Sequence, residues 1–468
     1  MPLILPGNVA SATAAVGYDV ANSLRFNRGD EPILSRTQST SPTDDDKCTM
    51  SLWFKPGAQT ATGGRGFSFG GSTDVNSRWH FYVETDAELY YYGKLGGSVN
   101  MTLNSTPMYR DPSAWYHYVV AIDTTQGTAA NRVRSYINNV EVTSWIASTY
   151  PSQNDNCPLV KDANMLIGAI RGGSYQLYNW TDGYLSEVHF IDGLQLTPAS
   201  FAEYDEDSPT IWKPKDCKAD LTYGTNGFYL EFKDSSALGD DTSGNSNDFT
   251  VTNLDATDQA TDTPTNNFCT INPLAGYVGS YVFSQGNCQI AQNAAYWHTR
   301  TSTMAVTKGK WYWEVELDAG TMIEIMVGFH DTSTDIKDIN AWLSGSMVFY
   351  NDAGGEFRID GVQTTADYGV LTAGDILGFA LNMDDKELTL YDNGSAIATD
   401  VSIGSNINEA TPSFISDATN VVFKANFGGC SAFTVSSANQ DGNGYGNFEY
   451  AVPSGYYALC TKNLAEYG

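Results

Sequence analysis

Acidic side chains at alternating positions are the first candidates for chemistry in this chain. Glu314, Glu316 and Asp318 alternate along one segment, and a second acidic run occupies residues 203–207. A glycosidase needs an acid and a second carboxylate on one strand face, so that both flank one bond. Neither run continues into a longer carboxylate pattern. We therefore expect Glu314, Glu316 and Asp318 to lie on the solvent-exposed face of a strand.

Nucleophilic catalysis has no better support in the sequence. There is no G-x-S-x-G motif, and the five histidines (His80, His117, His189, His298 and His330) fall in unrelated segments. We expect His117 and His189 to be core or rim residues. The Gly-rich segment 62–66 lacks the Lys-Ser/Thr of a phosphate-binding loop. These patterns predict that the protein is not an enzyme and requires no cofactor.

Aromatic side chains are stronger candidates for a binding site. Their faces stack on sugar rings, while Asp and Asn side chains hydrogen-bond to hydroxyl groups. The alternative is packing in the core or in a subunit interface. The residues considered are Tyr90, Tyr91, Tyr92, Tyr175, Tyr178, Trp180 and Trp297 with His298.

Oxygen-rich loops are the candidates for a metal site. Asp240, Asp241, Asn245 and Asp248 surround one glycine and could bind calcium, although they match no EF-hand spacing. A solvated turn is the favoured alternative for this loop. The run Asp44-Asp45-Asp46 offers the same choice between cation binding and solubility.

Composition narrows the partners and the compartment. The 468-residue chain has a formal net charge of −29, so its average field repels nucleic acid and anionic lipid. It has no apolar stretch long enough to span a membrane and no signal peptide at its N-terminus. We expect synthesis in a host cytoplasm, no nucleic-acid partner and no membrane insertion. The seven scattered cysteines are expected to be mostly buried thiols.

The first half of the chain has a two-residue period that predicts β-strands. Apolar residues alternate or run for four to eight positions, with Asn138-Asn139 as a hairpin turn and Thr197 as the cap of one helical turn at 197–201. Trp115 with His117, residues 136–139, Ile167-Gly168 and residues 182–188 follow one another in the order of the concanavalin A-like laminin-G and pentraxin superfamily. The first 200 residues therefore resemble that superfamily.

The second half carries five ordered motifs. Residues 308–316 include the strand segment Trp311-Tyr312-Trp313-Glu314, and Asp392-Asn393-Gly394 forms a tight hairpin turn. With 327–329, 374–383 and 425–428, these motifs resemble a SPRY domain. The predicted fold is all-β, with two consecutive antiparallel β-sandwich (jelly-roll) domains. The expected boundaries are an N-terminal arm at 1–17, a concanavalin A-like domain at 18–207, a linker at 208–222 and a SPRY-like domain at 223–468.

Nearly the full length, from the opening PLILPGN to the closing PSGYYALCTKNL, is similar to laminin-G/SPRY virion proteins of marine tailed bacteriophages. The resemblance implies a structural protein of the virion surface, most simply a tail fibre or appendage that attaches to a host surface glycan or receptor. Its implied partners are other virion subunits and further copies of the chain, with a trimer as one option. The alternative is head decoration or another architectural role that contacts only virion subunits.

Overall fold

The computed structural model describes residues 3–5, 17–58, 65–161, 164–172, 176–276, 281–294, 297–319, 325–336, 345–351 and 354–468. Strands account for 46% of the chain and helices for 5%, which confirms the predicted all-β class. The chain divides into two compact units. The first unit ends at Thr265, and the second contains residues 266–468 together with the N-terminal residues 3–5.

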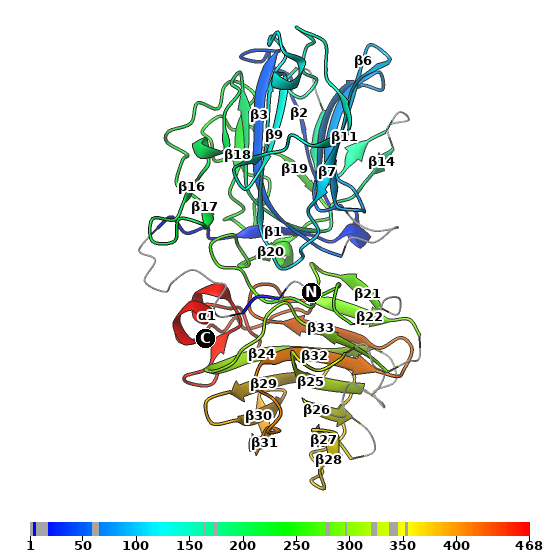
Figure 1. The fold of residues 1–468 in the computed structure, drawn as a ribbon, viewed down its shortest axis with the longest axis vertical. Helices are drawn as coiled ribbons and strands as arrows, with labels where there is room; N and C mark the ends of the chain where they lie inside the picture. The colour runs from blue at the N-terminus through cyan, green and yellow to red at the C-terminus, as the bar shows by residue number, and fades with distance from the viewer. Residues whose placement is uncertain are drawn as a thin grey trace. The chain divides into compact units, whose positions relative to one another are not determined.

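The first unit is a sandwich of two eight-stranded sheets (Figure 1). The first sheet has the order β10 (Val140–Glu141), β9 (Val133–Ile137), β8 (Tyr116–Asp123), β3 (Lys47–Pro56), β15 (Gly183–Asp192), β1 (Ser23–Phe26) and β20 (Gln259–Ala260), with β18 (Phe228–Leu230) also paired with β15. The second has the order β11 (Trp145–Thr149), β7 (Ser98–Met108), β6 (Glu88–Leu95), β5 (Ser77–Val83), β4 (Ser68–Asp74), β12 (Asn164–Ile167), β2 (Ile33–Thr37) and β19 (Thr250–Thr252).

Smaller elements complete the first unit. Two short antiparallel pairs join β13 (Ile170–Arg171) with β14 (Leu177–Tyr178), and β16 (Ala202–Tyr204) with β17 (Trp212–Pro214). Single 3₁₀ turns occur at Arg28–Asp30, Ala129–Asn131, Pro198–Ser200 and Ala256–Asp258. The turn at Pro198–Ser200 confirms the predicted helical turn. Thr197 is its N-cap residue and Pro198 its first residue, as predicted, and the Thr197 side chain makes no capping hydrogen bond.

The core of the first unit lies between its two sheets. Alternate residues of facing strands meet there, and burial of their apolar surface stabilises the unit. Between β9 and β10, Asn138 and Asn139 have φ of 48° and 66°, the left-handed conformation that a two-residue hairpin turn requires. The predicted hairpin is therefore confirmed. Core residues of the facing strands include Met50, Leu52, Phe54, Phe69, Trp79, Phe81, Tyr91, Leu103 and Tyr118.

The boundary between the units differs from the predicted one. The expected linker at 208–222 and the segment up to Thr265 belong to the first unit. There β18 pairs with β15, β19 with β2 and β20 with β1. β19 and β20 are only two or three residues long, too short to show a two-residue period in the sequence. β18 lies in an alternating segment that predicts a strand, but only its pairing with β15 assigns it to the first unit. Pairing with strands far away in the chain is what makes them strands.

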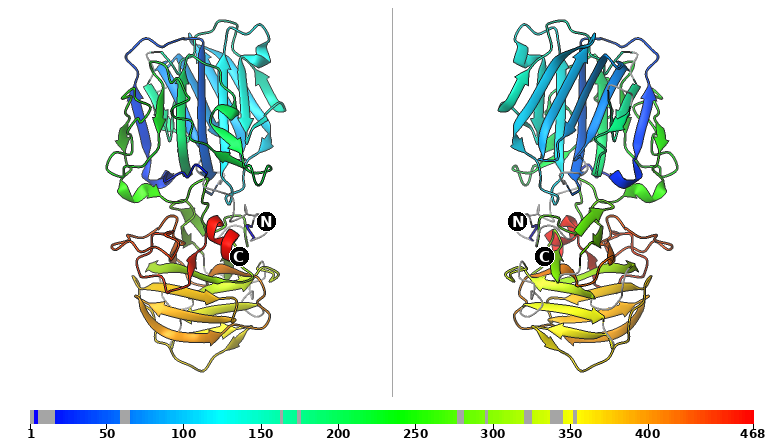
Figure 2. Two further views of the ribbon diagram at one scale, coloured as in Figure 1. Left: turned by 90° about the vertical axis from the view of Figure 1, so that its left-hand side faces the viewer. Right: turned by 90° about the vertical axis from the view of Figure 1, so that its right-hand side faces the viewer.

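The second unit is also a two-sheet sandwich, and Figure 2 shows its strands running side by side. Its larger sheet has the order β21 (Tyr281–Ser284), β22 (Gln289–Gln292), β33 (Val422–Asn426), β24 (Lys310–Ala319), β29 (Ile376–Asn382), β30 (Glu387–Asp392) and β31 (Ser395–Ser402), and β34 (Tyr457–Ala458) pairs with β24. The smaller sheet has the order β23 (His298–Thr301), β32 (Ala410–Ser416), β25 (Ile325–Asp331), β26 (Ser346–Asn351), β27 (Glu356–Ile359) and β28 (Val362–Gln363).

The second unit contains one of the predicted turns and the first described residues of the predicted arm. Asn393 and Gly394, with φ of 47° and 78°, form the predicted turn between β30 and β31. Of the predicted arm at 1–17, Ile4 bridges to Met304, whereas residues 6–16 lie outside the described residues. All seven cysteines are buried, which agrees with the prediction that most of them are. The chain ends in helix α1 (Thr461–Tyr467), and no helix in the described ranges has the length and apolar character to cross a membrane.

Candidate functional site

The outer face of the second sheet in the first unit collects aromatic side chains. In β5, Trp79 and Phe81 point into the core, so the two-residue alternation places His80 and Tyr82 on the opposite face. The same alternation in β6 buries Tyr91, whose side chain is 1% exposed. Its neighbours Tyr90 and Tyr92 are therefore on the outer face, where each is half-buried.

Strand register places polar and aromatic residues of this face in one row. Tyr92 lies opposite His80, and His80 lies opposite Gly70. Gly70 pairs with Leu166, and Leu166 pairs with Ser35 of β2. A Cβ on Gly70 would lie 2.9 Å from Cδ2 of His80, so the glycine leaves room for the imidazole in the middle of the row.

The rings of this face form a cluster around His80. Its ring centroid is 6.1 Å from that of Tyr92 and 6.4 Å from that of Tyr178. Tyr82 and Tyr90 make a second pair at 5.3 Å. Burial, followed by the nearby charge of Arg78, lowers the pKa of His80 to about 3, so its ring is neutral. Tyr178, on β14, is 39% exposed and offers the most accessible ring of the cluster.

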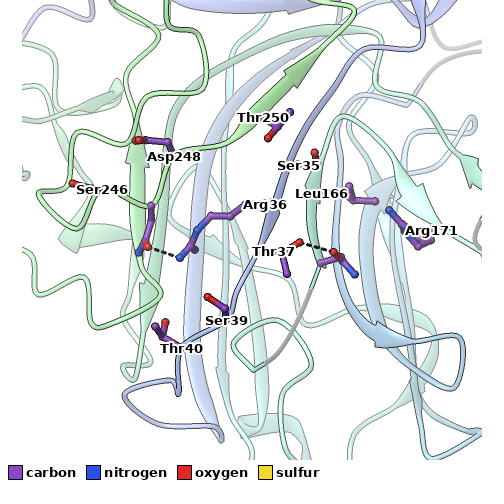
Figure 3. A pocket seen from close by; sticks show the side chains of 12 residues that line it. Ser35, Arg36, Thr37, Ser39, Thr40, Leu166, Arg171, Ser246, Asp248 and Thr250 are labelled. Atoms are coloured by element: carbon purple, nitrogen blue, oxygen red, sulfur yellow. Dashed lines mark hydrogen bonds between the residues drawn. The ribbon is translucent and has the colours of Figure 1, made fainter.

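A polar pocket of about 570 Å³ lies on the same sheet, over β2 and β12 (Figure 3). Leu166 is its one apolar lining residue, and the other lining residues carry hydroxyl, amide, guanidinium or carboxylate groups. Thr37 Oγ1 donates to Asn164 Oδ1 at 2.9 Å, and the Arg36 guanidinium donates to the side chain of Asn247. The volume falls within the range of small-molecule sites. Ser35 and Leu166 of this row line the pocket, whereas Gly70 and His80, which lie between them and Tyr92, are buried.

The structure brings together only some of the predicted ligand-binding residues. Tyr90 and Tyr178 share the outer face, whereas Tyr91 was wrongly assigned because it belongs to the core. Trp180 is half-buried, with its carbonyl accepting from the Arg65 N–H at 2.8 Å. Trp297 belongs to the second unit and packs beside Tyr350. Tyr175 lies outside the described residues.

Sequence reasoning missed most of the pocket. Ser35, Arg36 and Thr37 come from β2, and Arg171 comes from β13, two short strands that are far apart in the sequence. Nothing in the local sequence joins them. The alternation within 79–83 could have placed Tyr82 on the face opposite Phe81, because Trp79 and Phe81 alternate with His80 and Tyr82.

The predicted calcium loop is held closed by its own hydrogen bonds. Asp241 Oδ1 accepts the backbone N–H groups of Tyr229 and Ser243, and its Oδ2 accepts the Asn247 N–H and the Ser243 hydroxyl. Four donors occupy the four lone-pair sites of a carboxylate. Asp248 accepts the N–H of Asp241 at 2.9 Å. Asp241 thus fixes the loop, and calcium binding by Asp240, Asp241, Asn245 and Asp248 stays a prediction.

The other acidic run has mixed partners. Asp44, Asp45 and Asp46 each offer a carboxylate oxygen, and these oxygens lie within 4.8 Å of one another. Lys47 Nζ is 2.8 Å from Asp44, and Lys161 Nζ is 3.2 Å from Asp45. These ammonium groups already balance part of the negative charge. Calcium binding there stays a prediction.

A buried serine–histidine pair in the first unit is arranged for structure. Ser51 Oγ lies 2.8 Å from His117 Nε2, and both side chains are buried. Trp212 Nε1, which can only donate, bonds to His117 Nδ1 at 3.0 Å. Nδ1 is therefore the acceptor, and Nε2 carries the proton and donates it to Ser51. His117 cannot take a proton from Ser51 in this tautomer, and burial lowers its pKa to about 3.

The alternating acids of β24 do not form a catalytic pair. Glu314 is fully buried, which corrects the prediction that it faces solvent. Its carboxylate accepts from the Tyr312 hydroxyl, from Asn426 Nδ2 and from two backbone N–H groups at 449 and 450. Glu316 and Asp318 both pair with Lys424, at 3.2 and 3.1 Å. Each of these carboxylates thus has a structural partner.

Two family models match the chain. Residues 29–200 match the concanavalin A-like lectin/glucanases superfamily, and residues 310–429 match the SPRY domain. No curated protein matches the sequence.

Solved structures with similarity to parts of the chain include two SPRY domains and a pentraxin. The TRIM65 PSpry domain is 14% identical over 34% of this chain and 92% of its own, with a TM-score of 0.29. The SPRY domain of human HERC1 is 15% identical over 35% of this chain and 99% of its own, with a TM-score of 0.27. The heptameric SAP-like pentraxin from Limulus polyphemus is 18% identical over 38% of this chain and 80% of its own, with a TM-score of 0.29. At such values the similarity carries no inference about ligands. The family models show that this chain contains a concanavalin A-like domain followed by a SPRY domain.

Proposed function

We propose that the protein is a binding protein whose concanavalin A-like domain recognises carbohydrate on the outer face of its second sheet. The observation that supports this most directly is the cross-strand row that joins Tyr92 and His80 to Ser35 in the polar pocket. Sugar recognition combines ring faces for the apolar side of a pyranose with hydrogen-bonding groups for its hydroxyls. This face offers both types of group side by side.

Binding without catalysis is also favoured by the carboxylates. In the described part of the chain, Glu314 is saturated by donors, Glu316 and Asp318 share Lys424, and Asp241 fixes a loop. Among the described residues, only Asp248 contributes a carboxylate to the lining of the polar pocket. Glycoside hydrolysis by the usual mechanism needs two carboxylates across one bond. The described lining therefore does not supply the second group for that reaction.

A glycan array with the full-length protein tests this proposal. Tyr92→Ala and Tyr178→Ala should each weaken binding of the selected glycan about tenfold, because each removes one of the rings on which a sugar is proposed to stack. Tyr204→Ala is the matched control, since Tyr204 is 46% exposed in the same domain but lies on β16. Failure to bind any glycan, or equal binding by all three variants, would overturn the proposal.

We further propose that this binding serves host attachment on the surface of a tailed bacteriophage particle, as a tail fibre or appendage. The support is the sequence resemblance to laminin-G/SPRY virion proteins over nearly the full length, together with two domains of binding folds. Other virion subunits and further copies of the chain are the proposed partners. Head decoration is the competing proposal for the same resemblance.

Antibody-gold labelling of purified particles separates these proposals. Label at the tail is expected for a fibre or appendage, and the antibody should then block adsorption to host cells. Label spread over the head would replace attachment with decoration. Particles without any label would contradict both virion proposals and leave the carbohydrate proposal to be judged by the array.

A further inference from the structure

Two arginines reach the polar pocket from different strands. Arg36 extends from β2 and Arg171 from β13, with Ser35, Thr37 and Leu166 between them in Figure 3. Asp248 is the one carboxylate among the described lining residues. The other polar side chains are hydroxyls and amides, which donate as readily as they accept. The lining is therefore rich in hydrogen-bond donors.

The two arginines are not equivalent. Arg36 donates to the Asn226 carbonyl at 3.2 Å and to the Asn247 side chain, and the charges of Asp241 and Asp248 act on it. Its charge is thus partly balanced by the loop that it holds. Arg171 lies next to the aromatic cluster, because β13 pairs with β14 and its neighbour Ile170 lies opposite Tyr178. A ligand lying over Tyr92 and Tyr178 would therefore meet Arg171 at the edge of the pocket.

Further basic groups continue along the neighbouring row of the same face. Thr37 pairs with Asn164, Asn164 with Ser72, and Ser72 with Arg78, which pairs with Lys94. Arg78 places its guanidinium 5.6 Å from the Tyr92 ring centroid. Glu84, close to this cluster, is already paired with Arg65 at 3.2 Å. This concentration of basic groups contrasts with the net charge of −29 on the whole chain.

We infer that the ligand of this face is an acidic glycan, one whose sugars carry carboxylate or sulfate groups, with Arg171 as the residue that recognises the anionic group. The inference rests on the proposed carbohydrate function and names its ligand class. Guanidinium groups bind carboxylate and sulfate through charge-assisted hydrogen bonds. The adjacent tyrosines hold a ring of the same oligosaccharide, so the recognised unit spans at least two sugars.

The test compares charged and neutral forms of the same glycans by calorimetric titration of the full-length protein. Oligogalacturonate is compared with its methyl ester, and dextran sulfate with dextran, so that carboxylate and sulfate are examined separately. At least one anionic form should bind about tenfold more tightly than its neutral counterpart, which corresponds to about 1.4 kcal/mol. Its affinity should fall as salt is added, because salt screens exposed charges.

Variants of the pocket locate the effect. Arg171→Gln should reduce binding of the anionic form about tenfold and leave a neutral form unchanged. Thr37 is exposed and lines the pocket, so Thr37→Asp should fold. Thr37→Asn, which introduces the uncharged isostere of aspartate, should fold as well. The Asp variant should lose the anionic glycan and the Asn variant should keep it. Arg110→Gln is the matched control, because Arg110 is exposed and is not part of the pocket lining.

The outcomes separate this inference from the proposed function. Equal binding of charged and neutral forms, with dependence on Tyr92 and Tyr178, would overturn the acidic-glycan inference and keep the carbohydrate proposal. Anionic binding that ignores Arg171→Gln and Thr37→Asp would also overturn the inference. Loss of binding on adding a chelator would assign recognition to a bound cation instead of Arg171. No binding to any glycan would overturn the carbohydrate proposal itself.

Discussion

The two units each fix a long irregular segment with one buried carboxylate, but the carboxylates have different partners. In the first unit, Asp262 lies 2.6 Å from Lys55 Nζ, and both side chains are 1% exposed. Trp115 Nε1 donates to its other oxygen at 3.0 Å. In the second unit, the donors to Glu314 that the structure describes are all uncharged and include backbone N–H groups at 449 and 450.

The difference predicts how each unit fails. A carboxylate that faces a lysine depends on a full opposite charge, and loss of that charge leaves an ion in an apolar core. A carboxylate among neutral donors has no cation to lose, and it can take up a proton instead. Burial outweighs the lowering effect of the donors and raises the pKa of Glu314 to about 7. The stability of the first unit should therefore be sensitive to loss of the Lys55 charge beside Asp262. The stability of the second unit should be sensitive to pH through Glu314.

The largest effect is expected from Lys55→Met. The substitution leaves Asp262 without its cation and should cost about 3–5 kcal/mol of unfolding free energy. Urea denaturation measures the loss, and hydrogen exchange should locate it in the first unit. Adding Asp262→Leu removes the stranded charge and should recover much of the loss. A cost below about 1 kcal/mol would show that the ion pair between Lys55 and Asp262 does not hold this segment in place.

Glu314→Gln should have the next largest effect. The amide places N–H groups where the carboxylate accepted four donors, so at least one backbone donor is left unsatisfied. We expect a loss of about 2–3 kcal/mol and faster hydrogen exchange in the segment around Glu449 and Tyr450. Glu316→Gln is the matched control, since Glu316 lies on the same strand and pairs with Lys424 near the surface. Faster exchange in the first unit would contradict this assignment.

The pH dependence of the second unit should depend on Glu314. Its pKa rises from the usual 4.5 to about 7 in the folded protein, so between these values the folded state holds the proton more tightly than the unfolded chain. Stability from this group is therefore complete below pH 4.5 and is lost as pH rises to about 7. From about pH 5.5 to 7 the loss is about 2 kcal/mol.

Denaturation of the wild type and of Glu314→Gln across this pH range isolates the contribution. The difference in stability between the two should shrink as pH rises, because the wild type alone loses the bound proton. Parallel pH profiles for the two proteins would rule out Glu314 as the titrating group. Glu187 of the first unit also has a pKa raised to about 7 by burial, so exchange must be followed in peptides of the second unit.

The smallest effect is expected for an exposed ion pair. Lys310 Nζ lies 3.9 Å from Asp385, and their side chains are 38% and 64% exposed. Water screens such a pair, so Lys310→Ala should change the unfolding free energy by less than about 1 kcal/mol. The same measurement as for Lys55→Met then compares a buried lysine with an exposed one. A cost equal to that of Lys55→Met would show that burial does not explain the large effect expected for the Lys55–Asp262 pair.

Local patterns predicted the parts of this fold whose causes are local. The turns at Asn138-Asn139 and at Asn393-Gly394 follow from residues that tolerate positive φ. The motif-bearing strands of both halves follow from alternation. The run Tyr90-Tyr91-Tyr92 shows the limit of such patterns, because alternation requires the middle ring to face away from its neighbours without saying which side is the core. Packing between the two sheets decided that Tyr91 is inside.

Taken by itself, the sequence determined the all-β class, the order of the two domain types and the turns, because a two-residue period and turn residues act within a few positions of the chain. Tertiary structure decided where the first unit ends, which acids are buried and which side chains share the proposed binding face. Those features depend on strand register between distant segments: Ser35, Gly70 and Tyr92 lie in one row only because five strands pair in that alignment. Burial of one face of each strand selects that register, and for strands that are distant in the sequence no local pattern specifies the partner.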